Sequence, residues 1–238
     1  TTEIYTLSLH DALPIWACAG QRRSVYIVDD HPLVREGLAA LIRTTPDLAV
    51  AGEAGCATEA FRLLDEATPD LVMLDLCLPG LSGVELVKNV CAKYPQARVL
   101  VLSMHEEGVY AERVLRAGAQ GYIMKQAPGA DIIGAVRTVL RGEVYVSQAI
   151  ASRMLKMFVG GEQEPSQNPT VGQLSNRELQ VFTSIGSGMS TQEIAAQLNL
   201  NVKTIQTYRE HIKRKLHLRN ATDLIHTATQ WVQSGGQQ

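Results

Sequence analysis

From Val25 onward, short hydrophobic runs alternate with amphipathic stretches. In the first amphipathic stretch, Val34, Leu38, Leu41 and Ile42 recur at the spacing of one helical face. The hydrophobic runs are the length of buried strands, and read VYIV, LAVAGEA, LVMLD, RVLVLS and GYIMK. Five such strands alternating with five helices predict an α/β domain, with a doubly wound parallel sheet covered on both faces.

The pattern changes after Tyr145. SQAIASRMLKMF predicts a connecting helix, and the following GGEQEPSQNPTVG is typical of a flexible linker. From Leu174 onward only helical patterns remain, so a small all-α domain is expected. Three helix starts are marked by a capping residue, in two cases with a glutamate three positions later: Ser175 with Glu178, Ser190 with Glu193, and Asn201.

The first 20 residues do not fit this organisation. The run TTEIYTLSLHDALPI resembles a translated sequencing-adaptor read-through, and a disordered natural leader is the alternative. A signal peptide is not indicated, because no basic region precedes the apolar part and His10-Asp11 interrupts it. Residues 1–20 are therefore left out of the fold prediction. No run approaches the length of a membrane span, so no membrane association is expected.

Charge is unevenly distributed between the two predicted domains. The net charge is -2, but residues 171–238 carry seven Lys and Arg against four acids, or +3, which leaves -5 for the rest. A basic second half suggests a polyanionic partner. Cys18, Cys56, Cys77 and Cys91 have neither zinc-site nor disulfide spacing, so reduced thiols in a cytoplasmic protein are expected.

Polar side chains follow four of the predicted strands. Asp29 and Asp30 follow the first strand, Asp75 ends the third, Ser103 the fourth and Lys125 the fifth. The ligand site of a parallel sheet lies at this carboxyl edge, so the five side chains should meet. Taken singly, each could be a solvated strand end or a surface cation. Their shared position at the ends of different strands favours a site.

Three crowded carboxylates need a cation, and oxygen ligands suit Mg²⁺. With Lys125 the charges balance, and the site could then receive a phosphoryl group. Asp75 is ionised at neutral pH and can attack phosphorus directly, while Mg²⁺ and Lys125 stabilise the charge.

Four segments resemble the receiver domain of bacterial two-component response regulators over about residues 24–142: VYIVDDHPLVREGL, LVMLDLCLPGLSGVEL, VLVLSMH and AGAQGYIMK. The resemblance implies a flavodoxin-like fold with Asp75 as phosphoacceptor. It further implies that Asp30 and Asp75 bind Mg²⁺ directly, with Asp29 nearby or acting through water. The main-chain carbonyl of Cys77 would be the third protein ligand.

The same resemblance implies a switch. Lys125 would pair with the phosphoryl oxygens, Ser103 would hydrogen-bond to the phosphate, and Tyr122 would rotate inward behind it. A redox role for the Cys77 thiol is the alternative to a buried, inert thiol, and inertness is favoured. His31 is interpreted as a loop residue that helps to start the first helix rather than as a metal ligand.

The C-terminal pattern is a short helix from about Thr191 to Leu198, a tight turn, and a cationic helix from Val202 to about Leu216. This order predicts a helix-turn-helix, although a basic helix alone would equally be a solvated face. Residues 172–234 resemble the LuxR-type helix-turn-helix of NarL/FixJ-class regulators.

The resemblance implies that Gln206, Thr207 and Glu210 take the groove-facing positions of the recognition helix. At those positions Gln suits adenine, Thr a thymine methyl and Glu cytosine. Phosphate contacts are assigned to a second set, Lys203, Thr204, Tyr208, Lys213 and Arg214.

The last helix, from about Ala221 to Val232, must partly cover the domain core. In the LuxR-type family this helix also pairs two DNA-bound copies. The resemblance therefore implies dimerisation through Leu224, Ile225 and Ala228.

These features predict a phosphorylation-dependent transcription regulator with a receiver domain at 23–142, a connecting helix and linker at 143–171 and a DNA-binding domain at 172–234. The expected partners are a sensor histidine kinase, double-stranded DNA, a second copy when phosphorylated, and RNA polymerase as a further candidate. No enzymatic turnover is expected beyond self-dephosphorylation. The alternatives are a phosphatase with an aspartyl intermediate and a constitutive DNA binder whose receiver only dimerises.

Overall fold

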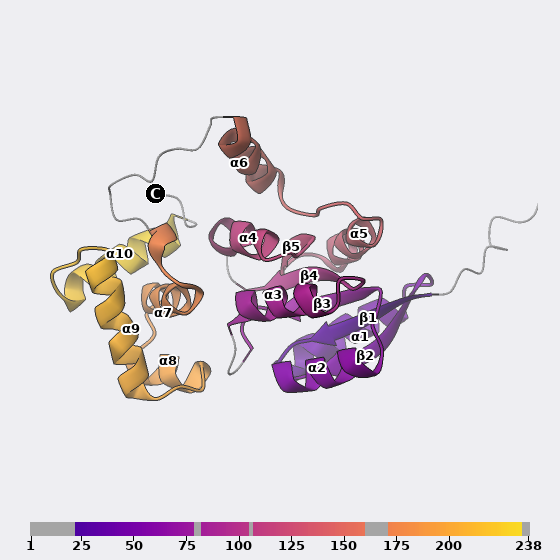
Figure 1. Cartoon of the computed structure of the whole chain (residues 1–238), viewed down its shortest axis with the longest axis horizontal. Helices are drawn as coiled ribbons and strands as arrows, with labels where there is room; N and C mark the ends of the chain where they lie inside the picture. The colour runs from indigo at the N-terminus through magenta and orange to yellow at the C-terminus, as the bar shows by residue number, and fades with distance from the viewer. Residues whose placement is uncertain (1–21, 79–81, 105–106, 160–170, 235–238) are drawn as a thin grey trace, which may run out of the picture.

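The computed structural model describes residues 22–78, 82–104, 107–159 and 171–234. The predicted leader at 1–20 and most of the predicted linker lie outside these ranges. In the N-terminal half, strands and helices alternate as predicted (Figure 1). The strands are β1 (Arg23–Val28), β2 (Leu48–Ala54), β3 (Leu71–Asp75), β4 (Arg98–Ser103) and β5 (Gly121–Met124). The helices are α1 (Pro32–Arg43), α2 (Ala57–Glu66), α3 (Gly83–Lys93), α4 (Glu107–Arg116) and α5 (Gly129–Leu140).

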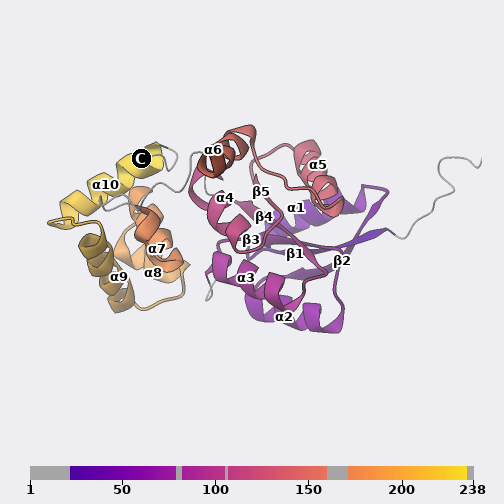
Figure 2. The ribbon, with the colours of Figure 1, turned by 45° about the horizontal axis from the view of Figure 1, so that its top comes forward.

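The five strands form one parallel sheet in the order β2-β1-β3-β4-β5, which confirms the predicted doubly wound fold. Alternate residues of β1 enter different cores, because side chains of a strand point to opposite faces. Val25 and Ile27 pack with α1 and α5, whereas Tyr26 and Val28 pack with α2, α3 and α4. The helices thus cover both faces of the sheet (Figure 2).

After α5 the chain runs along β5, which is an edge strand of the sheet. Tyr145 pairs with Gly121 of β5 in an isolated parallel bridge, and its carbonyl accepts a hydrogen bond from the N–H of Tyr122 at 2.9 Å. The N–H of Ser147 then donates to the Glu107 carboxylate of α4 at 2.7 Å. The connecting helix α6 (Gln148–Val159) follows and packs against α4. The connection is therefore anchored on α4 and β5.

The C-terminal domain contains a 3-10 turn, η2 (Val171–Gln173), and the helices α7 (Asn176–Gly186), α8 (Thr191–Gln197), α9 (Val202–Lys215) and α10 (Ala221–Gln233). The predicted helix starts are confirmed: Ser175–Glu178 and Ser190–Glu193 form complete capping boxes, and Asn201 caps α9. A cap of this kind stabilises a helix by roughly 1 kcal/mol. No helix within the described residues has the length and apolar character to cross a membrane.

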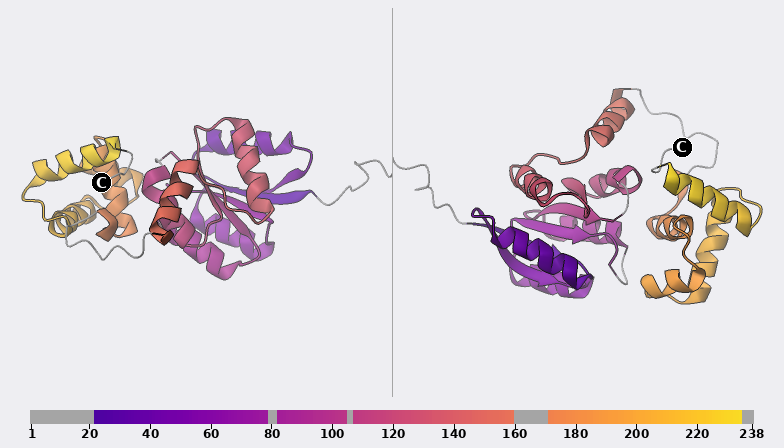
Figure 3. Two further views of the ribbon diagram at one scale, coloured as in Figure 1. Left: turned by 90° about the horizontal axis from the view of Figure 1, so that it is seen from above. Right: turned by 180° about the vertical axis from the view of Figure 1, so that it is seen from behind.

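The C-terminal domain lies beside the end of the sheet domain that carries α3 and α4 (Figures 1 and 3). Within this domain, α7 packs closely on α10 and α9. The rings of Phe182 and Trp231 meet at a centroid distance of 5.6 Å.

The α7–α10 contact leaves no room for a side chain at Gly186. A Cβ there would lie 2.4 Å from the carbonyl oxygen of Ala228 and 2.6 Å from the Val232 side chain. We therefore expect Gly186→Ala to lower the free energy of unfolding of this domain by about 1–3 kcal/mol through overpacking, measured by urea denaturation.

Gly37→Ala is the control, because a Cβ at Gly37 in α1 meets nothing within 4 Å. It should stabilise its domain by roughly 0.5–1 kcal/mol, the usual helical preference for Ala over Gly. A Gly186→Ala protein as stable as the parent would contradict the close helix contact.

Candidate functional site

The acidic side chains predicted to converge do so. Asp29 and Asp30 follow β1 and Asp75 ends β3, and one ligand atom from each, together with one from His31, lies within 4.8 Å of the others. Parallel order places these strand ends at one edge of the sheet. The cluster could hold a metal ion.

Lys125 connects two of these carboxylates from the end of β5. Its Nζ lies 2.7 Å from Asp29 Oδ2 and 2.7 Å from Asp75 Oδ2, and its side chain is only 3% exposed. The alternative of a solvated surface cation is therefore excluded. Removing Lys125, Asp29 or Asp75 would leave an uncompensated buried charge on the remaining groups.

The negative charge of the pocket exceeds what Lys125 neutralises. Burial raises the pKa of the Asp75 carboxyl, Lys125 opposes this effect, and the Asp29 charge adds to it. Asp29 Oδ2 lies 2.7 Å from the Lys125 ammonium and Asp30 Oδ1 lies 2.7 Å from His31 Nδ1. Clustered carboxylate oxygens are the ligand set that a hard divalent cation prefers.

His31 has a contact that the sequence interpretation missed. It stands at the N-cap position of α1 but makes no capping hydrogen bond with its side chain. Its Nδ1 instead lies 2.7 Å from Asp30 Oδ1. The adjacency of His31 to two acids in the sequence is the signal for this contact. His31 also begins α1 as predicted, since its carbonyl accepts a hydrogen bond from the N–H of Arg35 at 3.1 Å.

The predicted switch residues lie directly behind the pocket. Ser103 is fully buried and Tyr122 is 1% exposed, and their side chains are hydrogen-bonded to each other. Burial raises the pKa of the Tyr122 hydroxyl well above its usual value. Tyr122 thus already points inward in this structure, whereas the sequence interpretation placed its inward rotation after phosphorylation.

Two residues of α4 contact the C-terminal domain, and sequence analysis assigned them no role. The Tyr110 hydroxyl lies 3.2 Å from the Thr183 hydroxyl of α7. Arg113 donates to the carbonyl oxygen of Leu174 at 2.9 Å and to Asn176 Oδ1 at 3.1 Å. Nothing in the local pattern of a helix indicates a partner 61 to 73 residues away, so no sequence signal would have found these contacts.

On α9, the side chains assigned to DNA divide by exposure. One face of the helix is open to solvent and carries Lys203, Gln206, Thr207, Glu210 and Arg214. The others are half-buried at its margin: Thr204, Tyr208 and Lys213. Lys213 Nζ lies 2.9 Å from Glu210 Oε1, so the one anion on the exposed face is paired within the helix.

The predicted dimer residues differ in exposure. Leu224 and Ala228 of α10 are buried in their own domain, whereas Ile225 is 47% exposed. Their role in dimerisation stays a prediction.

Comparisons with known proteins identify the families of both domains. Residues 25–137 match the family described as "Response regulator receiver domain", and residues 172–228 match "Bacterial regulatory proteins, luxR family". The "Oxygen regulatory protein NreC" of Staphylococcus carnosus is 34% identical over 207 residues. That alignment covers 86% of this chain and 95% of the relative.

The chain is also similar in fold to solved structures of response regulators. A two-component response regulator of the LuxR family from Aurantimonas is 39% identical, covering 58% of this chain and 98% of that chain with a TM-score of 0.53. RcsB from Salmonella enterica, described as bound to promoter P1flhDC in the presence of phosphomimetic BeF3-, is 25% identical. It covers 88% of this chain and 99% of that chain with a TM-score of 0.60.

The Cys77 thiol beside the pocket should react slowly with alkylating reagents. Burial raises the pKa of the Cys77 thiol to about 12, and the Asp75 charge adds to the effect. Its usual value is 9.0. At pH well below both values, the thiolate fraction and the rate of alkylation should be about a thousandfold lower than in the denatured chain. Iodoacetamide labelling in EDTA buffer, followed by mass spectrometry, measures this rate.

Asp75→Asn removes the charge next to the thiol and should accelerate labelling of Cys77, because the thiolate is then less disfavoured. Labelling of native Cys77 as fast as in urea would contradict the inert interpretation and support a reactive thiol.

Proposed function

The chain belongs to the bacterial response regulators that join a receiver domain to a LuxR-family DNA-binding domain, and from this premise we propose that Asp75 is its phosphoacceptor. It is a phosphorylation-dependent, DNA-binding transcription regulator. The observation that carries the assignment is the position of the Asp75 carboxylate, held at the end of β3 between the Lys125 ammonium and two further aspartates.

Both oxygens of Asp75 are positioned for nucleophilic attack. Oδ1 accepts a hydrogen bond from the N–H of Cys77 at 3.1 Å, and Oδ2 is held by Lys125 at 2.7 Å. A carboxylate oxygen forms the bond to phosphorus, the bond from phosphorus to the donor imidazole nitrogen breaks, and the imidazole leaves with that electron pair. Lys125 compensates the charge on the transferred group.

The pocket fits Mg²⁺. We assign the metal to the carboxylates of Asp30 and Asp75 and the main-chain carbonyl of Cys77, with Asp29 beside them or acting through water. The clustering of carboxylate oxygens from Asp29, Asp30 and Asp75 within 4.8 Å supports this assignment. Bound Mg²⁺ would supply electrostatic stabilisation of the phosphoryl oxygens.

We assign sensing of the phosphoryl group to Ser103, Tyr122 and Lys125. Lys125 exchanges its Asp75 contact for the phosphoryl oxygens, and Ser103 turns its hydroxyl toward them. Because Ser103 and Tyr122 are hydrogen-bonded, a turn of one hydroxyl changes the partner of the other. We retain the domain limits predicted from the sequence, namely 23–142, 143–171 and 172–234.

We assign DNA recognition to the exposed face of α9. Gln206, Thr207 and Glu210 would read base edges, and a larger set would contact phosphates, namely Lys203, Thr204, Tyr208, Lys213 and Arg214. The RcsB structure with promoter DNA supports this use of the domain. A sensor histidine kinase is the expected phosphoryl donor, and a second copy paired around Ile225 is the expected dimer partner.

Asp75→Asn should abolish the uptake of acid-labile phosphate from acetyl phosphate and Mg²⁺, because an amide oxygen is a far weaker nucleophile. Phosphate-affinity gels and intact mass spectrometry measure the uptake. Asp131→Asn, a substitution of the same kind at an exposed position of α5, is the control and should retain full uptake. Full phosphate on Asp75→Asn would defeat the assignment.

Glu210→Ala should tighten binding to all DNA sequences several-fold and reduce selectivity. The substitution removes an anion from the DNA face and releases Lys213 for phosphate contact. Selection from a random duplex library, with affinities measured at fixed salt, tests both effects. Glu36→Ala on α1 makes the same change in net charge outside the DNA face and should change neither. Unchanged selectivity of Glu210→Ala would rule out base reading by Glu210.

A further inference from the structure

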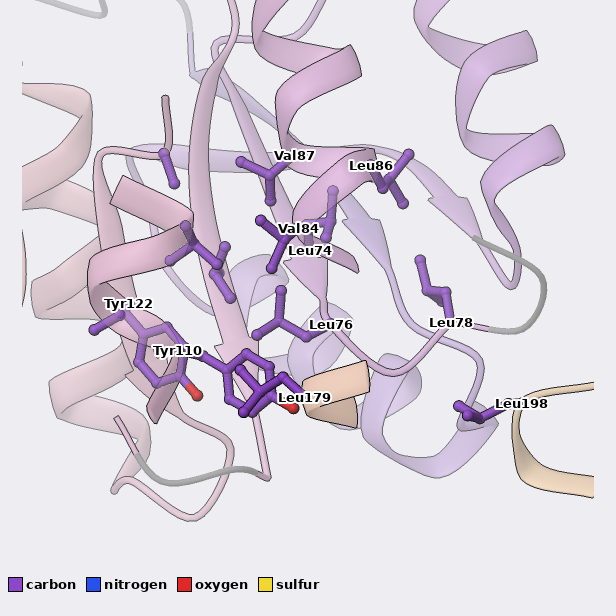
Figure 4. Close-up of a cluster of buried hydrophobic side chains, with 14 of the residues drawn as sticks. Leu74, Leu76, Leu78, Val84, Leu86, Val87, Tyr110, Tyr122, Leu179 and Leu198 are labelled. Carbon is purple, nitrogen blue, oxygen red and sulfur yellow. The ribbon is translucent and has the colours of Figure 1, made fainter. Parts of the chain in front are cut away.

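The acids of the pocket differ in how their backbone is held. Asp75 is fixed by hydrophobic packing, because Leu74 and Leu76 on either side of it are both buried in the core (Figure 4). The loop after β1 has no comparable support. Each side chain of residues 30–34 is exposed or half-buried, and Leu33 is 84% exposed. The position of this loop must therefore depend on polar contacts.

Arg35 of α1 supplies such a contact to the residue that begins the loop. Its Nη1 donates a hydrogen bond to the main-chain carbonyl of Asp29 at 2.6 Å, and its side chain is only 22% exposed. A hydrogen bond from a charged donor is shorter and stronger than a bond between neutral groups. The peptide group is planar and trans, so holding this carbonyl fixes the plane that joins Asp29 to Asp30.

The Asp29 carbonyl needs this donor because the strand pairing ends here. β1 pairs with β2 up to Val28 and Ala54. The Asp29 N–H still donates to the Ala54 carbonyl at 3.0 Å, and the carbonyl of Asp29 takes the Arg35 guanidinium as its donor. Asp29 is 1% exposed, and a buried main-chain carbonyl is costly to leave without a partner. Arg35 therefore continues the support of the sheet by one residue.

A carboxylate of β2 keeps the guanidinium near the loop. Glu53 Oε2 lies 3.8 Å from Arg35 Nε, and Glu53 Oε1 lies 2.8 Å from Arg43 Nη2. Arg35 and Arg43 thus share one half-buried anion although both belong to α1. Of the two, Arg35 is the one that also bonds to the loop, since Arg43 lies at the far end of the helix.

A shift of the Asp29 peptide would displace both acids of the loop. Asp29 Oδ1 accepts a hydrogen bond from the N–H of His31 at 2.9 Å, and Asp29 Oδ2 lies 2.7 Å from the Lys125 ammonium. Both contacts depend on where the Asp29 backbone lies. Asp30 is the next residue, so its carboxylate moves with the same peptide. Metal affinity is sensitive to groups that orient the ligands without touching the metal.

We propose that Arg35 is a positioning residue of the pocket, which holds the loop after β1 so that the carboxylates of Asp29 and Asp30 face a bound Mg²⁺. The inference rests on the proposed function, because it takes Mg²⁺ as the ion that these carboxylates meet. Arg35 acts through the Asp29 carbonyl and does not itself bind the metal or the phosphoryl group.

The test uses the sign of the change in affinity. Loss of a positive charge near an acidic pocket should by itself tighten Mg²⁺ binding, whereas loss of positioning should weaken it. In the full chain, Arg35→Gln should raise the Kd for Mg²⁺ about tenfold, measured by titration with Mg²⁺ followed through amide NMR shifts. Arg43→Gln is the matched control, because it removes the same charge from the same helix and the same Glu53. Its Kd should be unchanged or slightly lower.

Phosphate uptake from acetyl phosphate supplies a second readout. The Mg²⁺ concentration for half-maximal rate should rise about tenfold in Arg35→Gln, and the rate at saturating Mg²⁺ should approach that of the wild type. A rate that stays low at saturating Mg²⁺ would contradict a role limited to positioning the metal ligands.

Amide hydrogen exchange in Mg²⁺-free buffer separates the loop from general stability. Exchange of residues 29–34 should be about tenfold faster in Arg35→Gln than in Arg43→Gln, with exchange in β3 unchanged, because exchange reports local opening. Equal exchange of the loop in both variants, or an equal increase in β3, would overturn the specific role of Arg35.

The outcomes distinguish this inference from the proposed function. If the wild type binds Mg²⁺ and Arg35→Gln binds it as tightly or more tightly, the positioning role is wrong and the metal assignment stands. If Mg²⁺ leaves the amide shifts of Asp29, Asp30 and Asp75 unchanged in the wild type, the metal assignment is wrong and the positioning role falls with it.

Discussion

The buried contact of the Lys125 ammonium with Asp29 and Asp75 is the interaction on which the rest of the receiver depends. It joins the ends of β1, β3 and β5 at one point, with both nitrogen–oxygen distances at 2.7 Å. The three side chains are at most 3% exposed, so their charges interact strongly and any added charge redistributes them. On the proposed function, a phosphoryl group entering this pocket changes the partners of Lys125, and this couples phosphorylation to a rearrangement of the strand ends.

Such a rearrangement has a defined route, because β5 and α4 contact both the connection that leads to α6 and the DNA-binding domain. Tyr122 belongs to β5, and its backbone N–H is bonded to Tyr145 of the connection that leads to α6. Glu107 at the start of α4 holds Ser147 of the same connection. Farther along α4, Tyr110 and Arg113 hold α7. A small shift of α4 or β5 is therefore transmitted to the connection and to the DNA-binding domain together.

The sequence predicted local features well, because each depends on residues close together in the chain. The two capping boxes and the Asn201 cap start helices where expected, since they satisfy backbone groups within one turn. The five strands were identifiable from short apolar runs. The convergence of Asp29, Asp30, Asp75 and Lys125 was also predictable, because parallel strands align their carboxyl ends by topology alone.

Other features were decided by tertiary packing. The resemblance implied dimerisation through Leu224 and Ala228, and packing places both in the core of their own domain. Tyr122 is buried already, and the His31 side chain lies against Asp30 rather than capping α1. By itself the sequence determined the element order, the chemistry of the pocket and the cationic helix, because these follow from periodicity and residue type. Only the tertiary structure decided that α4 meets α7, because that contact joins residues 73 positions apart whose pairing depends on the relative placement of two domains.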